Sequence, residues 1–542
     1  MNTNQWLWTR LLGTTNDESA KALTTGVDGA IYVAGYTYVY SFEGKFDGQT
    51  TINSPDAFIT KYNPDGTKVW TRLLGTTRSN DRATALTTGS DGAIYVAGYT
   101  EWSGGGDFSI FDGQTKYGND DAFITKYNPD GTKVWTRLLG GEYKEQASAL
   151  TTGTDGAIYV AGYTTSNFDG KRSNGNDDAF ITKYNPDGTK VWTQLLGSAQ
   201  DDYAKALTTG SDGAIYVAGY TFTANTMDGQ TTSSIYTPEV FLTKYNPDGT
   251  KVWTRLLGST TKDGGKWDEA HALTTGIDGA IYVAGWVAGN MDNQTNSGGF
   301  DAFITKYNPD GTKVWTRLLG STRDDFATSL TTGTDGAIYV AGYTDSSLDG
   351  QTANGKKDAF ITKYNPDGTK VWTRLLGTTS NDQATALTSG NDNSIYVAGY
   401  TGDNLNGEIF NGKYFEGDVF ITKFSEPTIK KSNLTVLVNK GILGPDPIII
   451  NNLVEEISSN GSTTLSHTVT YNGIQFNYAD IDPLITTVVR DGNFTEEFRR
   501  EISDLFPSLK DIGYSDAIVA VGITNIDNTL LYVAGADGNF VG

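Results

Sequence analysis

A 20-residue segment, DAFITKYNPDGTKVWTRLLG at residues 121–140, recurs with small changes through the first four-fifths of the chain. In its two halves, AFITKY and KVWTRLL, apolar and polar residues largely alternate and β-branched and aromatic types are abundant, which favours strands. Between them, Pro129 presets φ for a turn and Gly131 accepts the positive φ that a hairpin needs. The segment is predicted to be a β-hairpin, and its repetition limits the chain to a repeat architecture.

A second predicted hairpin precedes each copy of the first. At residues 85–100, ALTTGSDGAIYVAGYT contains a short strand, a Gly-x-Asp-Gly turn and a longer strand rich in Val, Ile and Tyr. One unit therefore has four strands, in the order ALTT, AIYVAGYT, DAFITKY and KVWTRLL.

The two ends of the repeated region are complementary. The fourth strand occurs in seven copies, marked by Trp8, Trp70, Trp135, Trp192, Trp253, Trp315 and Trp372. The first copy, at residues 6–13, has no first three strands before it, and the third strand at residues 418–424 has no fourth strand after it. Radially packed sheets cover each other's faces and leave only short edges. We therefore predict an all-β, seven-bladed β-propeller of four-stranded blades, whose last blade is closed by the N-terminal strand, with residues 7–12 pairing with residues 420–424.

The domain organisation follows from the repeat. Residues 1–424 are predicted to form the propeller and residues 425–431, SEPTIKK, a linker. Residues 432–542 are predicted to form a small α+β domain that mediates attachment or oligomerisation. Its NLTVLVN and TTLSHTVTY segments are typical of strands, and Thr495 is predicted to cap an amphipathic helix that Pro507 ends.

The repeated YVAGYT and DAFITKYNPDGTKVWTRLLG motifs resemble the SBBP-type (seven-bladed β-propeller) repeats that are frequent in cyanobacterial proteins. The resemblance extends over about residues 6–424. It implies a propeller and often a cell-surface or secreted setting. It implies no single activity and no catalytic motif, because a fold alone does not determine function.

Composition excludes several classes of function. The formal net charge of −22 argues against a nucleic-acid backbone or an anionic membrane as partner. The absence of cysteine excludes disulfides, thiol nucleophiles and Cys-ligated metals. No apolar run approaches the roughly 20 residues of a membrane span, and the N-terminus lacks the pattern of a Sec-type signal. We expect an extracellular, cell-surface or virion location reached by a non-Sec route, with a cytoplasmic location as the alternative.

The loops differ between the two ends of the predicted blades. The GxDG and NPDG turns at one end are nearly identical in all units. At the other end, the loops between the second and third strands and the connections between blades, such as residues 259–269, differ in length and sequence, and we call both kinds variable loops. Aromatic residues in these variable loops are candidates for stacking on a sugar or anchoring a protein. The predicted ligand-binding residues are Tyr38, Tyr40, Trp102, Phe108, Tyr236 and Trp267. Phe42, Phe111 and Tyr414 are further candidates of the same kind. The alternative is that these rings fold inward and pack their own loops.

Two sets of carboxylates recur in every unit. The first set precedes an alanine by two residues and consists of Glu18, Asp81, Glu145, Asp202, Asp268, Asp325 and Asp382. The second set opens the third strand and consists of Asp56, Asp121, Asp178, Glu239, Asp301, Asp358 and Asp418. Paired carboxylates can hydrolyse glycosides or bind Ca²⁺. Because the sets occur in all seven units, we expect them instead to accept backbone N–H bonds at the blade junctions. No cofactor is expected, with Ca²⁺ as the alternative, and no catalytic or metal role is expected for His271 or His467.

The leading hypothesis is a non-enzymatic binding or structural protein that presents its variable loops for adhesion or assembly, at a bacterial surface or matrix or in a virion or tail-like particle. The partner would be a protein or a glycan at the variable loops, and a larger assembly would be held through the C-terminal domain. The alternatives are a propeller glycoside hydrolase or lectin acting on polysaccharide, and an intracellular assembly scaffold. A hydrolase should have one blade whose inner positions carry unique carboxylates or Arg. The ALTT strands show none, since only Ser329 and Ser389 depart from the pattern.

Overall fold

The computed structural model of the protein describes residues 6–38, 45–51, 55–75, 79–102, 110–222, 226–231, 237–259, 267–412 and 417–425, together with seven strands after residue 427. The chain divides into two compact units. One is Trp6–Phe424, and the other combines Met1–Gln5 with Ser425–Gly542.

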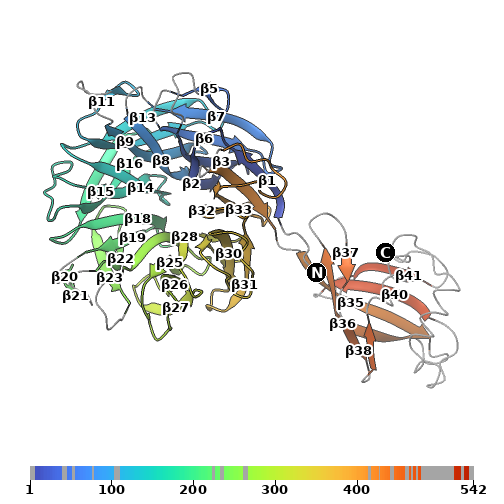
Figure 1. Ribbon diagram of the computed structural model, residues 1–542. Helices are drawn as coiled ribbons and strands as arrows, with labels where there is room; N and C mark the ends of the chain where they lie inside the picture. Colours follow the sequence, from blue (N-terminus) through green and yellow to red (C-terminus); the bar gives the residue numbers. More distant parts are fainter. Residues whose placement is uncertain are drawn as a thin grey trace. The chain divides into compact units, whose positions relative to one another are not determined.

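Seven four-stranded antiparallel sheets form the described part of the unit Trp6–Phe424, arranged as the blades of a ring (Figure 1). The first strands of the blades lie toward the centre of the ring. Blade 1 contains β2 (Glu18–Thr25), β3 (Ile31–Thr37), β6 (Asp56–Tyr62) and β7 (Lys68–Leu74). Blade 2 contains β8 (Ser79–Thr88), β9 (Ile94–Trp102), β12 (Asp120–Tyr127) and β13 (Lys133–Leu139). Blade 3 contains β14 (Glu145–Thr152), β15 (Ile158–Thr164), β16 (Asp178–Tyr184) and β17 (Lys190–Leu196).

The remaining four blades repeat this order, and the last borrows its outer strand from the start of the chain. Blade 4 contains β18 (Asp202–Thr209), β19 (Ile215–Thr221), β22 (Glu239–Tyr245) and β23 (Lys251–Leu257). Blade 5 contains β24 (Glu269–Thr275), β25 (Ile281–Val287), β26 (Asp301–Tyr307) and β27 (Lys313–Leu319). Blade 6 contains β28 (Asp325–Thr332), β29 (Ile338–Thr344), β30 (Asp358–Tyr364) and β31 (Lys370–Leu376). Blade 7 contains β32 (Asp382–Ser389), β33 (Ile395–Thr401), β34 (Asp418–Phe424) and β1 (Trp6–Leu12).

The predicted closure of the ring by the N-terminal strand is confirmed. β1 pairs antiparallel with β34, from Trp6 opposite Phe424 to Leu12 opposite Val419. The Trp6 ring meets the Phe424 ring edge-on at a centroid distance of 5.2 Å. Because β1 completes a sheet that otherwise ends at β34, the ring is closed without a covalent link.

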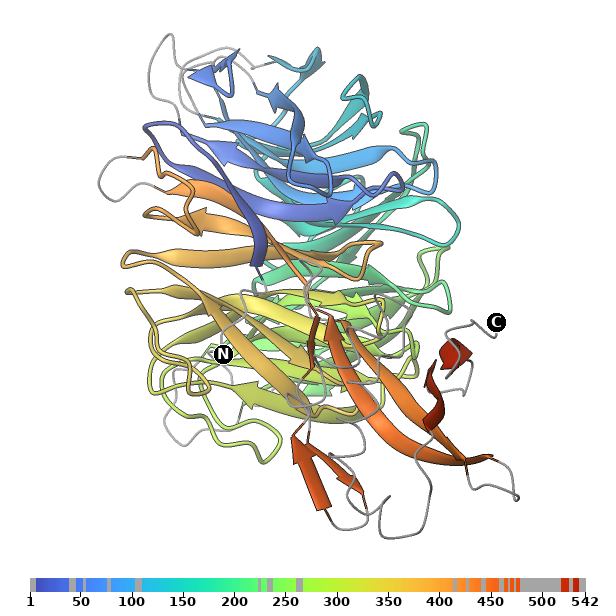
Figure 2. The same ribbon diagram turned by 90° about the vertical axis from the view of Figure 1, so that its right-hand side faces the viewer.

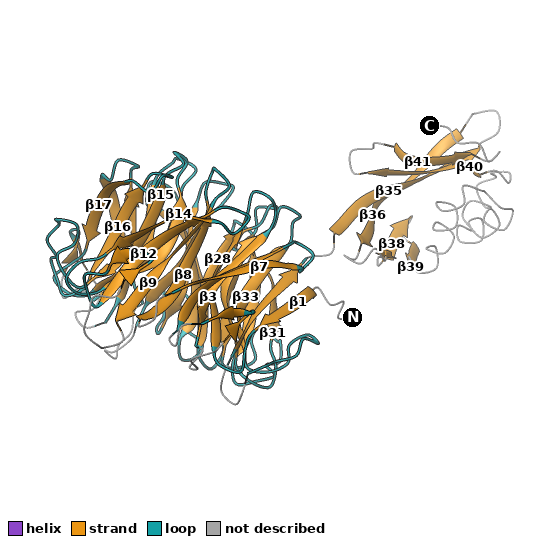
Figure 3. Ribbon diagram, turned by 90° about the horizontal axis from the view of Figure 1, so that it is seen from above, coloured by secondary structure: helices purple, strands orange, loops and turns teal. Residues whose placement is uncertain are grey.

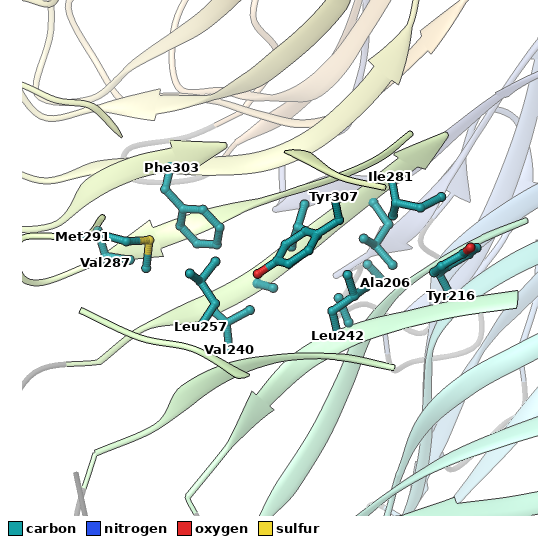
Figure 4. Close-up of a cluster of buried hydrophobic side chains, with 14 of the residues drawn as sticks. Ala206, Tyr216, Val240, Leu242, Leu257, Ile281, Val287, Met291, Phe303 and Tyr307 are labelled. Carbon is teal, nitrogen blue, oxygen red and sulfur yellow. The ribbon is translucent and has the colours of Figure 1, made fainter. Parts of the chain in front are cut away.

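Adjacent blades lie face to face (Figure 2), so their central strands are buried on both sides. In β19 and β25, each of the first five residues is buried. Between blades 4 and 5, Tyr216 and Leu242 pack in one cluster with Ile281 and Tyr307 (Figure 4). Apolar and polar residues therefore alternate less strictly in these strands than in the strands of a sheet with one solvent-exposed face.

The outer strand of one blade is joined to the turn of the next by hydrogen bonds. The Trp192 indole donates to the Pro247 carbonyl at 3.2 Å, and the Trp315 indole to the Pro366 carbonyl at 3.2 Å. Arg317 Nε donates to the carbonyl of Gly368, a turn residue with φ of +84°. The NPDG turn is nearly invariant because its backbone receives these side chains.

Each first strand contains a β-bulge opposite the glycine of YVAG. In blade 2 the bulge lies between Ala83 and Ala85, opposite Gly98 and Ala97. A Cβ on Gly98 would lie 1.9 Å from the Arg82 carbonyl oxygen. Only glycine permits this approach of the two backbones, which brings the first strand close to the second at the bulge.

Several variable loops contain a short hairpin of two strands, each two residues long. These are β4 (Lys45–Phe46) with β5 (Gln49–Thr50), β10 (Ile110–Phe111) with β11 (Gln114–Thr115), and β20 (Thr226–Met227) with β21 (Gln230–Thr231). The Phe111 ring is buried and stacks on the Phe123 ring at 4.9 Å. Phe111 therefore packs its own loop instead of facing a partner.

The described part of the second unit consists of strands (Figure 3). β37 (Thr463–Leu465), β36 (Pro445–Ile457), β35 (Thr428–Asn439), β40 (Ile518–Asn525) and β41 (Leu530–Gly535) form a five-stranded sheet in that order, and β38 (Thr468–Tyr471) pairs with β39 (Ile474–Asn477). β35 begins at Thr428, inside the segment predicted as a linker, because Thr428 and Ile429 continue the backbone pairing with β36. The helix predicted after Thr495 falls outside the described residues, as does His467.

Candidate functional site

The first strands of the seven blades line a cavity of about 160 Å³ on the axis of the propeller. Small or short residues such as Ala206 and Ala272 line it, as the crowded centre requires. Three basic residues, Lys21, Lys205 and His271, also line it. The strand end that leads to the variable loops forms the mouth of this cavity.

An aromatic residue follows the YVAG glycine in each blade, and we call these seven residues the mouth ring. They are Tyr36, Tyr99, Tyr163, Tyr220, Trp286, Tyr343 and Tyr400. All seven are half-buried. Each lies near the end of the second strand that leads to a variable loop, so the ring is on the variable end of the propeller.

The residue opposite each mouth-ring residue varies among the blades, and only blades 3 and 7 share a residue type. The strand registers pair the ring with Ser19, Arg82, Gln146, Tyr203, Glu269, Phe326 and Gln383, respectively. We call these the partner positions. They stand between the repeated carboxylate and the repeated alanine, and they give the seven-fold ring a chemically asymmetric mouth.

The sequence comparison of the ALTT segments missed the partner positions. The first strands begin within two residues of the carboxylate, before ALTT, so an Arg and an additional carboxylate occur once each at inner positions, as Arg82 and Glu269. The signal was present in the sequence as one variable residue within each otherwise repeated carboxylate-x-Ala triplet. The strand register places this variable residue opposite the mouth-ring residue of the same blade.

Arg82 connects three aromatic rings in blades 1 and 2. Its guanidinium donates hydrogen bonds to the hydroxyls of Tyr99 and Tyr38, both at 2.9 Å. The guanidinium carbon also lies 5.2 Å from the centroid of the Tyr36 ring. Tyr38, a predicted ligand-binding residue, is thereby fixed at the edge of the mouth.

Lys205 lies among three tyrosine rings of blades 3 and 4. Its ammonium is 5.5 to 5.9 Å from the centroids of Tyr163, Tyr203 and Tyr220. The Tyr203 hydroxyl donates to the carboxylate of Asp177. Burial lowers the pKa of the Lys205 ammonium.

A third cluster occupies blades 5 and 6. His271 Nε2 lies 2.8 Å from a carboxylate oxygen of Glu269, and its ring stacks on Trp286 at 3.9 Å. The Phe326 ring contacts both Trp286 and Tyr343, at 5.0 and 4.8 Å. Burial lowers the pKa of His271, and the hydrogen bond with Glu269 opposes this shift.

A polar groove of about 770 Å³ lies on the same end, between the variable loops of blades 2 and 3. Tyr117 and Tyr143 line it and are 72% and 54% exposed. Glu142, Asn167 and Arg172 add hydrogen-bonding groups. Exposed aromatic faces beside such groups are suited to holding a sugar ring.

The predicted ligand-binding residues are placed only in part. Trp267 is 47% exposed, and Phe222 meets its ring edge-on at 5.6 Å. The side chain of Trp102 and all of Tyr40, Phe108 and Tyr236 lie outside the described residues, as do Phe42 and Tyr414. Among the predicted residues that are described, Tyr38 is the one in contact with the mouth ring.

The repeated carboxylates lie at the blade junctions, where they accept hydrogen bonds from loops. Asp202 accepts from the Ser198 backbone N–H at 2.6 Å, and Asp178 from that of Asn174 at 2.6 Å. Both side chains are fully buried, and burial raises the pKa of Asp202 to about 7. This agrees with the predicted structural role. Among the described residues, no group of three or more His, Asp or Glu side chains could hold a metal ion.

Comparison with known proteins supports the repeat assignment. The family "SBBP: Beta-propeller repeat" matches residues 314–349, and a domain of unknown function (DUF5122) beta-propeller matches residues 154–190. The chain therefore carries SBBP-type propeller repeats. No described helix is long and apolar enough to cross a membrane.

Two curated proteins are similar over much of the chain. Regulatory protein FlaEY of Caulobacter vibrioides is 27% identical over 64% of this chain and 39% of its own length. Uncharacterized WD repeat-containing protein L264 of Acanthamoeba polyphaga mimivirus is 22% identical over 72% of this chain and 36% of its own. The chain thus spans less than two-fifths of either relative.

Solved structures with a similar fold include enzymes and proteins of unknown function. A Dyadobacter fermentans protein of unknown function has a TM-score of 0.40 and 12% identity, covering 78% of this chain and 98% of that one. The periplasmic gluconolactonase PpgL of Pseudomonas aeruginosa has a TM-score of 0.41 and 14% identity, and the match covers 67% of this chain and 87% of that chain.

Proposed function

We propose that the protein is a non-enzymatic, carbohydrate-binding propeller whose variable end recognises a glycan. The asymmetric mouth supports the proposal: seven aromatic residues in equivalent places face partner residues of six different types. In a ring with only a structural role, the same partner residue could make the same contacts in every blade, so the partner residues would not have to differ. Rings with nearby amide, hydroxyl and charged groups supply the stacking and hydrogen bonds that sugars require.

The neighbouring groove extends the proposed surface. Tyr117 and Tyr143 are exposed, although both are large and have apolar faces. They belong to the variable loops, where a change of sequence leaves the blades intact. In this proposal the unit Ser425–Gly542 attaches the propeller to a larger assembly, at a cell surface or matrix or in a virus particle, and an intracellular scaffold is the alternative setting.

Glycan-array binding by the intact protein tests the proposal. We expect Tyr220→Ala and Tyr117→Ala to weaken binding about tenfold, because each removes a stacking surface. Ile277→Ala is the matched control, since Ile277 is 74% exposed in a GxDG turn at the opposite end. Binding that is unchanged in both tyrosine variants, or reduced equally by the control, would contradict the proposal.

Polysaccharide hydrolysis is a second candidate, which one observation favours. Arg82 and Glu269 are each unique among the partner positions, as a catalytic asymmetry would require. The Glu269 carboxylate is, however, hydrogen-bonded to His271. Release of reducing ends from bound glycans, abolished by Glu269→Gln, would establish the hydrolase and replace the non-enzymatic proposal.

A further inference from the structure

The cavity on the propeller axis has a charge opposite to that of the chain. Its described lining contains Lys21, Lys205 and His271 among Ala, Leu, Thr and Ser side chains, and no Asp or Glu. The whole chain carries 63 acidic against 41 basic residues. The described lining of the axial cavity thus contains basic side chains and no acidic ones, in a chain with more acidic than basic residues.

The two ammonium groups contact aromatic faces instead of counter-ions. Lys205 is enclosed by three tyrosine rings, and the Lys21 ammonium lies 5.5 Å from the centroid of Tyr36. No described residue forms an ion pair or a hydrogen bond with either ammonium. Cation–π contacts stabilise the charge but leave the N–H donors free for an acceptor.

The neighbouring groups do not satisfy these donors. Glu269 raises the pKa of Lys205, but its carboxylate is also bonded to His271. Arg82 repels Lys21 and, with burial, lowers the pKa of that ammonium.

The threonine hydroxyls of the cavity have partners of their own. Thr84 donates to the Ala147 carbonyl at 2.8 Å, and Thr328 to the Ala384 carbonyl at 2.8 Å. The lysine ammonium groups are therefore the charged donors that the cavity offers to a ligand.

We propose that the axial cavity is a binding site for a small anionic group, a carboxylate, sulfate or phosphate, which Lys21 and Lys205 hold. A volume of about 160 Å³ accommodates such a group with water, since one water needs only about 10–15 Å³. An anion beside either ammonium group accepts charge-assisted hydrogen bonds, which are stronger than those between neutral groups. The inference goes beyond glycan recognition at the mouth, because it depends on the cavity and not on the loops.

Isothermal titration of the intact protein with inorganic phosphate, sulfate and acetate tests the site. We expect saturable binding of at least one of these ions and a rise in melting temperature on its addition. Glucuronate and glucose form a further pair of titrations. Tighter binding of glucuronate than of acetate identifies an acidic sugar as the source of the anion, and equal binding identifies a free ion. Glucose binding as tight as glucuronate binding would overturn the proposal.

The double variant Lys21→Met, Lys205→Met keeps the apolar stems and removes both charges. We expect its anion affinity to fall at least about tenfold and the anion-dependent rise in melting temperature to disappear. Lys356→Met is the control, because Lys356 is an exposed lysine outside the cavity. Unchanged affinity in a folded double variant, or no saturable binding of any ion by the native protein, would overturn the proposal. Neutral-glycan binding at the mouth would survive that result, so the two proposals fail separately.

Discussion

Replacing Asp202 by Asn should change how the stability of the propeller depends on pH. Asp202 and Asp178 meet at the junction of blades 3 and 4, both fully buried. Burial is the main cause that raises the pKa of Asp202 from 3.8 to about 7, and the nearby Asp178 raises it further. Holding Asp202 as an anion in the folded state is therefore unfavourable.

The direction of this pH dependence follows from how tightly the folded and unfolded states bind the Asp202 proton. Between pH 4 and 7 the folded state holds the Asp202 proton more tightly than the unfolded state, so this residue's contribution to stability falls as the pH rises through that window. The difference between 3.8 and about 7 corresponds to about 4 kcal/mol as an upper limit. The asparagine of Asp202→Asn cannot ionise. Between pH 4 and pH 8, the free energy of unfolding of this variant should therefore rise relative to that of the native protein by up to about 4 kcal/mol.

Urea unfolding followed by tryptophan fluorescence measures this difference. All 11 tryptophans lie between residues 6 and 372, so the signal reports on the propeller alone. Asp187→Asn is the control with the opposite sign. Asp187 is an exposed turn residue whose pKa is lowered by the hydrogen bond from the Thr189 N–H, so its contribution is present at neutral pH and lost in acid. A stability difference between Asp202→Asn and native protein that is equal at pH 4.5 and pH 8 would refute the reasoning.

Three further changes test the architecture. Deleting residues 1–13 exposes the edge of β34 and removes six paired positions, so the unfolding free energy should fall by about 5 kcal/mol or more; an unchanged melting temperature would count against the closure. Gly98→Ala places a Cβ 1.9 Å from the Arg82 carbonyl and should destabilise by about 3 kcal/mol or more in urea titrations, whereas a neutral effect would show that the strands can separate at no cost. Trp192→Phe removes the hydrogen bond to Pro247 and should cost about 1–2 kcal/mol by the same assay; a gain in stability would contradict the role of this contact.

Part of the site was predictable because it depends on local and repetitive features. The variable end was located from the turn sequences alone, since NPDG and GxDG fix one end of every blade. The junction role of the carboxylates followed from their presence in every unit. The sequence pattern indicates Tyr38 as a loop aromatic, and in the structure Arg82 donates a hydrogen bond to its hydroxyl at 2.9 Å.

The sequence by itself determined the number of blades, their strand order and the closure of the ring, because hairpin chemistry is local and the missing strand at one end is present at the other. Only the tertiary structure decided which residues face the axis. A bulge in each first strand shifts the alternation of side chains, so period-two reasoning cannot tell whether Lys21, Lys205 or His271 points into the cavity. The mouth ring and its unlike partners likewise come together because residues from seven repeats converge on one axis, and no segment of the chain contains that geometry.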